Sequence, residues 1–514
     1  MSRRRMAALA VPLVAAAATP AFGQSPPSTS TGPSTTTQPY VIPVADGVHI
    51  TSLLTVDDGA ASNGYELDGT PDGLGAMRDG AKHFTLFMNH EFNALTGTTR
   101  RHGQIGSYVS KFRIDRHSLE VKGGEDAIDP GVQFWDYVSQ RYQPTASAGG
   151  PNPRLPGDVF PAQGNAFARF CSATLSARRQ FESRHSDRGY PGRIYFANEE
   201  NGNEGRAFGM LEDGTTQQLP RLGLFSWENT MPAYNRSDTT MTIGSEDGQF
   251  GQLRVYEGVK RGRGNAFDRA GLTNGVTSVL DLVDETVSTD PAFRARYGKG
   301  MPVEFDLAEV DWDQSGVRQN VEAAADGFTM DRIEDGVWDP KHPDVFYFLT
   351  TEGGDATRTD PTIARDGGGL WRLEFEDIER PRLGGTIELL LDGSEAPYLN
   401  KPDNVAVDRR GNLLIQEDPG NNAHVARIVA YDTHSGARGV VATFDPERFA
   451  VGGSHFITDD EESSGIIDAK HVMGPGWFLF DAQVHAPAAD PRHVALGQLL
   501  AMKVDDFGRV YDLQ

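Results

Sequence analysis

The sequence predicts an all-β fold, a six-bladed β-propeller with loop and helical insertions. Three observations lead to this prediction. The chain has 514 residues with 58 Gly and 30 Pro, so turns are frequent and many short strands are favoured over long helices. Short apolar runs that end in a polar or acidic cluster recur six times. A hydrophobic fraction of 38% is sufficient for a buried core in a chain of this length.

The N-terminus precedes the predicted fold. Residues 1–23 contain three adjacent arginines, an apolar run and small residues, the order typical of an export signal. The arginines also fit a twin-arginine signal loosely, so both export routes stay open. Residues 24–39 are rich in Ser, Thr and Pro and are predicted to form a disordered linker. We therefore expect a periplasmic or secreted protein with a single propeller domain over residues 40–514.

The charge of the chain restricts its partners. Its formal net charge is −24, and such a surface repels nucleic acid and anionic lipid. We therefore expect no nucleic-acid partner. No stretch after the signal is apolar enough to span a membrane, so we expect no membrane contact. We also expect a monomer. An anionic substrate requires cations that reverse the local charge. The single cysteine, Cys171, excludes an intramolecular disulfide.

The six apolar runs are the main functional signal. They end on Glu91; on Glu199 and Glu200; on Glu246 and Asp247; on Glu352; on Glu417 and Asp418; and on Gln483 with His485. In a propeller the inner strands run in the same direction, so equivalent ends gather at one mouth of the central channel. Because crowded carboxylates raise one another's pKa unless cations neutralise them, the pattern predicts bound metal.

Two segments interrupt the strand pattern. Residues 132–158 are predicted to form a loop excursion, and residues 258–325 begin with a basic loop, "VKRGRGN". Within the second segment, residues 288–298 and 315–327 have the capping and Gly-stop signals of short helices. We expect both segments to be insertions on the faces of the propeller, where they could cover the channel mouth.

The residue types at the strand ends favour particular metals. Carboxylate and amide oxygens are the ligands that calcium prefers, whereas a thiolate favours a softer centre such as iron. Cys171 therefore decides between the two chemistries. Its alternative role is that of a small buried apolar residue, since Phe167 and Phe170 flank it. The sequence has no GxSxG, GxxxxGK[ST] or HExxH motif, so a serine triad, a P-loop and a zincin site are not supported.

Seven motifs occur in an order that carries a family resemblance. They are "GTPDGLGAMRDG", "LFMNHE", the single Cys-Ser, "ANEENG", "DRIEDGVWDP", "KPDNVAVDRRGNLLIQED" and "FDAQVH". This ordered set resembles the PhoX-type alkaline phosphatases and covers most of the mature chain. The resemblance implies an exported six-bladed propeller with a mixed iron and calcium cluster at the channel mouth. It also implies hydrolysis of phosphate esters.

The strand-end pattern and the resemblance together give a set of candidate residues. The predicted metal ligands are Glu91, Cys171, Glu199, Glu200, Glu246, Asp247, Glu334, Asp403, Glu417 and Asp418. The predicted catalytic residues are Arg332 and Glu334, which match an Arg-Pro-Glu motif with Ile333 in place of proline. The planar guanidinium of Arg332 suits the oxygens of a phosphate group. The alternative role of Arg332 is a salt bridge to Asp331 or Glu334.

The chain also departs from the family pattern. The segment between Cys171 and Glu199 is longer than in close relatives, and residues 460–465, "DEESSG", match no family motif. The expected activity is hydrolysis of phosphate monoesters of small phosphorylated substrates, with calcium and iron as cofactors. Two alternatives stay open. One is a calcium-dependent propeller hydrolase of another class, lactonase-like or phytase-like, and the other is a non-enzymatic, calcium-stabilised propeller that binds a partner.

Overall fold

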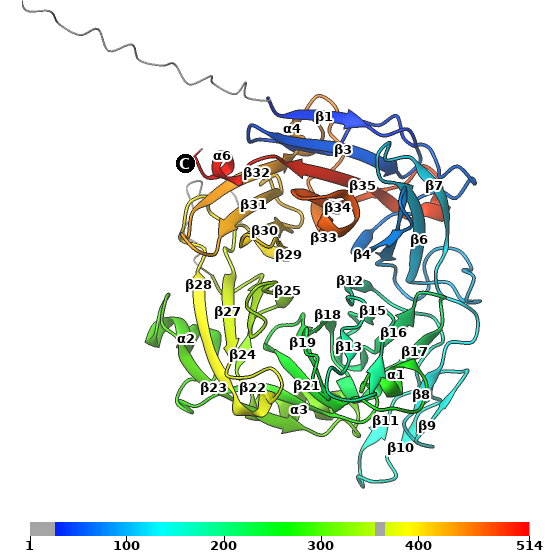
Figure 1. Cartoon of the computed structure of the whole chain (residues 1–514), viewed down its shortest axis with the longest axis vertical. Helices are drawn as coiled ribbons and strands as arrows, with labels where there is room; N and C mark the ends of the chain where they lie inside the picture. Colours follow the sequence, from blue (N-terminus) through cyan, green and yellow to red (C-terminus); the bar gives the residue numbers. More distant parts are fainter. Residues whose placement is uncertain (1–25, 355–364, 513–514) are drawn as a thin grey trace, which may run out of the picture.

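The sheets of the protein are arranged in a ring (Figure 1), in a computed structural model that describes residues 26–354 and 365–512. The predicted export signal, residues 1–23, lies outside the described residues. Six innermost strands of the described chain surround the axis: β4 (Pro71–Asp79), β12 (Phe170–Leu175), β18 (Trp227–Pro232), β25 (Ile333–Trp338), β29 (Pro402–Val407) and β33 (Glu461–Asp468). Each contacts the next, and β33 contacts β4, which closes the ring. The predicted propeller fold is confirmed.

The first two blades are separate four-stranded antiparallel sheets. Blade 1 contains β4, β5 (His83–His90), β6 (Tyr108–Asp115) and β7 (Val121–Asp126). Blade 2 contains β12, β15 (Ile194–Glu199), β16 (Ala207–Leu211) and β17 (Thr216–Gln218). Each of these strands pairs with the one before it, as expected for a meander of short strands joined by turns.

Blades 3 and 4 are joined into one nine-stranded sheet. Blade 3 contains β18, β19 (Thr239–Glu246), β21 (Arg254–Val259) and β22 (Val276–Leu282). Blade 4 contains β25, β26 (Val345–Thr350), β27 (Gly369–Phe375) and β28 (Gly385–Leu391). Strand β23 (Val303–Val310) pairs with both β22 and β28 and so connects the outer edges of the two blades. The sheets therefore do not correspond one to one with the blades.

The N-terminal residues close the ring in blades 5 and 6. Blade 5 contains β29, β30 (Asn412–Glu417), β31 (Arg427–Asp432) and β32 (Arg438–Phe444), and it is completed by β2 (Val41–Pro43). Blade 6 contains β33, β34 (Trp477–Pro487) and β35 (Ala495–Val504), and it is completed by β3 (Val48–Thr55) and β1 (Ser28–Thr31). Strands from both ends of the chain thus share these two sheets.

The disorder predicted for residues 24–39 is not found from Ser28 onward. β1 pairs in parallel with β3, and the hydroxyl and amide groups of Thr36 and Thr37 donate hydrogen bonds to Asp58. The Ser- and Thr-rich composition indicated a solvated tether, but Thr is also a good strand former. The edge of blade 6 supplies the backbone partners that an isolated tether would lack.

Short hairpins and helices lie between the strands of the blades. The prediction that residues 258–325 are an insertion is wrong in part, because they contain β22 of blade 3 and the bridging strand β23. The hairpins are β8 (Phe134–Asp136) with β9 (Arg141–Gln143), β10 (Gly150–Pro151) with β11 (Val159–Phe160), and β13 (Phe181–Glu182) with β14 (Gly189–Tyr190), and a further pair is β20 (Gly251–Gln252) with β24 (Thr329–Met330). The helices are α1 (Ala266–Arg269), α2 (Asp290–Arg296), α3 (Gly316–Asp326), α4 (Pro446–Phe449), α5 (Lys470–Met473) and α6 (Phe507–Tyr511), with 3-10 turns η1 (Gly202–Glu204), η2 (Pro220–Leu222), η3 (Pro381–Leu383) and η4 (Pro491–His493). Helices α2 and α3 lie where the capping signals predicted them, and Thr289 caps α2.

The hydrophobic core lies between neighbouring blades. One buried cluster fills each of the six interfaces, for example the cluster of blades 2 and 3 in which Phe225 stacks on Trp227 at 3.8 Å. Because the faces of each sheet pack on two neighbours, the strands are apolar on both sides. No helix among residues 26–354 and 365–512 is long and apolar enough to cross a membrane.

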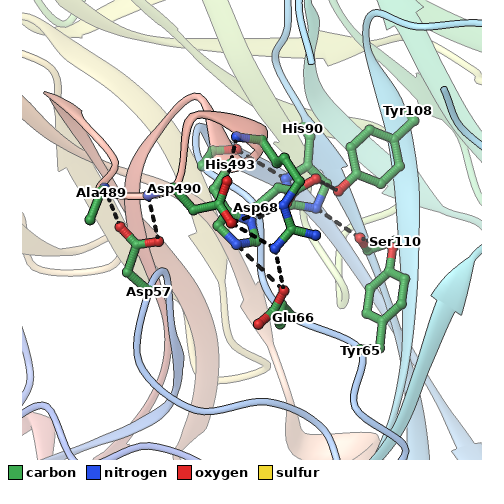
Figure 2. Close-up of polar contacts among 12 residues, drawn as sticks. Asp57, Tyr65, Glu66, Asp68, His90, Tyr108, Ser110, Ala489, Asp490 and His493 are labelled. Carbon is green, nitrogen blue, oxygen red and sulfur yellow. Dashed lines mark hydrogen bonds and ion pairs between the residues drawn. The ribbon is translucent and has the colours of Figure 1, made fainter. Parts of the chain in front are cut away.

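A buried polar network joins blades 1 and 6 (Figure 2). Asp68 is at its centre, with the Tyr108 hydroxyl 2.6 Å from one carboxylate oxygen and His493 Nδ1 2.6 Å from the other. Arg100 forms an ion pair with the same carboxylate. The ring of His90, the last residue of β5, stacks on Tyr108 at 4.4 Å. The network therefore fixes the end of β5 against the connection between β34 and β35.

We expect this network to make stability depend on pH. Burial alone would raise the pKa of Asp68, but the hydrogen bond from His493 and the charge of Arg100 outweigh it, and the pKa falls from 3.8 to about 2. Because the folded pKa is below the unfolded one, the stabilisation is complete above about pH 4 and is lost as the pH falls through about 2. This stabilisation amounts to about 2 kcal/mol of the free energy of unfolding.

Asp68→Asn should lower the free energy of unfolding at pH 7 by about 3 kcal/mol, because Arg100 would keep a buried charge without its partner. Urea unfolding at pH 7 and pH 3 measures this loss, which should be smaller at the lower pH. Glu125→Gln, which removes an exposed ion pair with Lys111 in the same blade, should change the value by less than about 1 kcal/mol. Equal effects of the two variants would contradict the assignment.

Candidate metal centre

The innermost strands carry metal-binding side chains at one shared position. The second residue of each strand is Asp72 in β4, Cys171 in β12, Glu228 in β18, Glu334 in β25, Asp403 in β29 and Glu462 in β33. Each strand also has a β-bulge in its pairing with the next strand, and in five of the six the bulge comes directly after the first paired residue. A bulge redirects the side chains beside it. The repeated bulge therefore places these side chains at the same end of the channel.

Two compact groups result from this arrangement. The ligand atoms of Asp72, Glu91 and Cys171 lie within 4.8 Å of one another, and so do those of Glu228, Glu334 and Asp403. Glu228 accepts a hydrogen bond from the hydroxyl of Ser172, the residue after Cys171, and the charge of Glu228 raises the pKa of the Cys171 thiol. Because Glu228 belongs to the second group and Cys171 to the first, these contacts make the two groups parts of one cluster.

The electrostatics of the cluster require cations. Burial raises the pKa of Glu334 well above its ordinary value, and the neighbouring charges of Asp247 and Asp403 raise it further. Burial raises the pKa of the Cys171 thiol well above its ordinary value, and Asp72 raises it further. These groups become good ligands only when ionised, and nearby positive charge is what favours their ionised form.

A further observation supports the fit between these donor atoms and a metal cluster. Both carboxylate oxygens of Asp481 are buried without a hydrogen-bond partner among the described residues, and the charge of Asp481 also raises the pKa of Asp72. The pKa of Glu462 is raised well above its ordinary value, first by burial and then by Asp418 and Asp403. Isolated buried carboxylates are costly unless they are paired or bind a metal. The residues present thus fit the metal group that the sequence predicted.

The structure brings most of the predicted site residues together. Glu91, Cys171, Glu334 and Asp403 belong to the two groups. Glu200, Asp247, Asp418 and Arg332 lie beside them, as their electrostatic contacts with these members show.

The structure does not bring Glu199, Glu246 and Glu417 into the cluster. Each forms an ion pair with an arginine at the start of the neighbouring strand: Glu199 with Arg206, Glu246 with Arg254 and Glu417 with Arg427. Successive residues of a strand face opposite sides. In each acidic doublet the first carboxylate therefore turns into the blade and the second toward the channel.

We expect the two members of the first doublet to have separable roles. Glu199→Gln should lower the free energy of unfolding by about 3 kcal/mol, because it leaves Arg206, which is 5% exposed, without a counter-charge. Glu200→Gln should leave the metal-free protein as stable as the wild type within about 1 kcal/mol and should lower the phosphate-ester hydrolysis that the sequence predicts. Urea unfolding in the presence of a chelator, together with an activity assay, checks both. A loss of stability in both variants would contradict the division of roles.

Three cationic residues lie at the starts of innermost strands, at the end of the channel where the cluster lies. Arg169, Arg332 and Lys401 directly precede β12, β25 and β29, and their φ angles are 45°, 55° and 49°. Left-handed φ angles in non-glycine residues are uncommon and cluster at functional sites.

Both arginines of this set form ion pairs with cluster carboxylates. Arg332 lies 2.9 Å from Asp247 and 3.2 Å from Glu334, so the salt bridge considered from the sequence is present. Arg169 contacts Glu91 at 2.6 Å and also pairs with Glu200. The arginines are thus held at the mouth with part of each guanidinium facing outward, since their side chains are 26% and 42% exposed.

Sequence reasoning missed several residues of the cluster. They are Asp72, Glu228, Glu462, Asp481 and Arg169. The analysis considered where apolar runs end, but antiparallel neighbours begin where their partners end, so strand starts lie at the same mouth. The signal available in the sequence was a polar residue directly after Pro or an aromatic residue, as in Pro71-Asp72, Trp227-Glu228 and Pro402-Asp403.

The fold and this cluster define a propeller protein with candidate metal sites at one end of its channel. The family model "Alkaline phosphatase PhoX" matches residues 212–465. The chain belongs to the PhoX family, and it is an enzyme of the alkaline phosphatase type. This result favours an enzyme over the non-enzymatic alternative. No curated protein sequence matches the chain.

Solved structures support the same fold. The chain is similar to Pseudomonas fluorescens PhoX in complex with vanadate, a transition state analogue, with a TM-score of 0.59 and 12% identity, covering 94% of this chain and 98% of that one. A second similar structure, the BP39L lectin from Burkholderia pseudomallei, has a TM-score of 0.34 and 10% identity, covering 86% of this chain and 97% of that one. At these identities the likeness concerns the fold, and the second score is too low to carry an argument.

Proposed function

We propose that the chain hydrolyses phosphate monoesters of small molecules at a mixed iron and calcium centre in the channel mouth, as an exported, monomeric enzyme. The observation that carries the proposal is a thiol within 4.8 Å of two carboxylates in one group, beside a second group made only of carboxylates. A phosphatase needs positive charge opposite the phosphate oxygens, and this end of the channel gathers both metal ligands and arginines.

The two groups suit different metals. Asp72, Glu91 and Cys171 combine sulfur and oxygen donors, which favours a transition metal, and we assign iron to them. Glu228, Glu334 and Asp403 offer oxygen alone, and we assign calcium to them. When bound, the metal ions supply Lewis-acid polarisation of the phosphoryl group and offset its negative charge.

The residues of the chain position the substrate. Asp247 and Glu334 hold Arg332 from one side, so its remaining N–H groups are oriented for the non-bridging oxygens of a phosphate. Arg169 is held in the same way across the cluster. Thr351 donates a hydrogen bond to Glu334 at 2.5 Å. This bond fixes the carboxylate that belongs to the second group and pairs with Arg332. These contacts make the site rigid before the substrate arrives, which reduces the entropy cost of orienting it.

Elemental analysis of the purified protein, run beside a p-nitrophenyl phosphate assay, tests the proposal. We expect iron and calcium in the protein, turnover of the monoester, and loss of turnover when a chelator removes calcium, with recovery after calcium is added back. Bis(p-nitrophenyl) phosphate serves as the diester control. Full activity without iron would contradict the iron assignment and favour a calcium-dependent hydrolase of another class. Preference for the diester would contradict the substrate class.

A further inference from the structure

A cavity lies at the end of the channel opposite the metal cluster. It has a volume of about 630 Å³, and its walls are formed by the distal halves of the innermost strands, for example Leu74, Leu175, Val337, Val407 and Ile467. The metal-binding side chains come from the second position of the same strands, so the cavity and the cluster are at opposite ends. Nothing in the proposed phosphatase mechanism uses this cavity.

The walls of the cavity are mainly apolar, and its inner end is closed by a satisfied polar pair. Asp335 accepts hydrogen bonds from Asn229 Nδ2 at 2.7 Å and from the backbone N–H of Val405 at 3.4 Å. Because these groups are bonded to one another, they do not require a polar ligand. The volume and the apolar lining with a few polar groups are typical of small-molecule sites.

The rim of the cavity carries three arginines, Arg78, Arg178 and Arg193. The Nε of Arg78 donates to the backbone oxygen of His471 at 2.7 Å, and Arg193 donates to that of Ser176 at 2.9 Å, so backbone carbonyls hold both side chains in place. Arg193 also lies 4.0 Å from Glu212, whereas within the described part of the chain no carboxylate lies within ion-pair distance of Arg78 or Arg178.

This positive charge is unusual in its setting. The chain has a formal net charge of −24, and two of the rim arginines lie close together. Burial lowers the pKa of Arg193 most, the charge of Glu212 raises it, and the nearby charge of Arg178 lowers it further. The carboxylate at the rim, Asp468, accepts a hydrogen bond from the backbone N–H of Lys470. Like charges held together over an apolar cavity are stabilised by an anion that contacts both.

We propose that this cavity binds a small amphipathic anion, an unbranched alkyl carboxylate whose head group contacts the rim arginines and whose chain lies against the apolar walls. The volume is equivalent to about 20 water molecules at about 30 Å³ each, so a medium-length chain fits. The guanidinium fork matches the carboxylate, and the buried chain contributes about 0.8 kcal/mol for each methylene removed from water.

Calorimetric titration of the metal-loaded enzyme with octanoate tests the proposal. The titrations are performed with inorganic phosphate at a saturating concentration, which occupies the metal end. Octylamine keeps the tail and reverses the charge of the head group, and acetate supplies the head group alone. We expect one saturable site for octanoate and binding of both control compounds at least 10-fold weaker. Octylamine binding as tightly as octanoate, or loss of octanoate binding in phosphate, would overturn the proposal.

Variants locate the site. Arg178→Glu changes an exposed side chain at the rim and should weaken octanoate binding at least 10-fold, with phosphatase activity unchanged. Arg263→Glu, an exposed arginine of the basic loop away from the cavity, is the matched control and should not change binding. Leu175→Trp should reduce binding by filling the cavity, and its folding is checked by the retained phosphatase activity. Unchanged binding in Arg178→Glu would overturn the proposal.

Discussion

Cys171→Ala should abolish the phosphatase activity while the propeller stays folded. The thiol lies within 4.8 Å of ligand atoms of Asp72 and Glu91, so its removal takes away the sulfur donor of the proposed iron group. We expect a loss in kcat of more than about 100-fold, since even indirect partners of metal ligands cost 10- to 100-fold when they are removed. The ferric-thiolate absorption in the visible range and the iron content should disappear in the same variant.

The fold is expected to survive this change because Cys171 contributes little to the core. Its neighbours Phe167 and Phe170 belong to the apolar cluster of blades 1 and 2, and Cys171 does not. Thermal unfolding in a chelator should therefore give the same midpoint for the variant and the wild type. Cys171→Ser keeps the size of the side chain and serves as the control for packing. Unaffected activity in Cys171→Ala would remove the iron-centred version of the mechanism and leave the calcium-dependent alternative.

The propeller was predictable because its evidence is local. An apolar run such as Ile194–Phe196 followed by a polar cluster indicates a buried strand that ends at a surface, and repetition of this unit indicates repeated blades. The pairing between blades is not local. The union of β22, β23 and β28 depends on strand-edge contacts, and those between β23 and β28 join residues about 80 positions apart. One sequence does not contain that register.

The same distinction explains which site residues were found. The doublets Glu199-Glu200, Glu246-Asp247 and Glu417-Asp418 were visible as acids after a strand, but their division into an ion-paired and a channel-facing member depends on strand phase. Glu417 is an example of the ion-paired member of a doublet. Burial raises the pKa of Glu417, but Arg427 and His424 outweigh this and lower it to about 2, so that carboxylate is neutralised within its own blade.

The bulges account for the residues that were missed. An uninterrupted strand would alternate sides, so a single polar residue near its start, such as Glu228 in "FSWEN", predicts nothing specific. The bulge after Trp227 changes the direction of the residues beside it, and a bulge stands at the same position in five of the six innermost strands, while that of β33 comes after Ser464. The sequence shows a bulge poorly, because it consists of one extra residue in an otherwise ordinary strand.

Arg332→Lys should lower kcat/KM for a phosphate monoester by about 100- to 1,000-fold, the range measured when one preorganised donor to a developing oxyanion is removed. The substitution keeps the positive charge and, because lysine meets the same steric limits at a φ of 55°, it keeps the backbone conformation. What it removes is the planar fork that contacts Asp247 and Glu334 on one side and would contact the phosphate on the other. Steady-state kinetics and unfolding measurements on the same preparations check the result.

The matched control is Arg372→Lys, because Arg372 pairs with Glu388 on outer strands of the same blade and is similarly exposed, at 33% against 26%. It should leave kcat/KM unchanged. If Arg332 has only the structural role of pairing with Glu334, the variant will lose stability and metal affinity but will regain its activity at saturating calcium. If Arg332 contacts the substrate, saturating calcium will restore the metal content and leave kcat/KM low. This second outcome is the one we expect, because two carboxylates and a left-handed backbone hold the guanidinium at the mouth where the substrate must arrive.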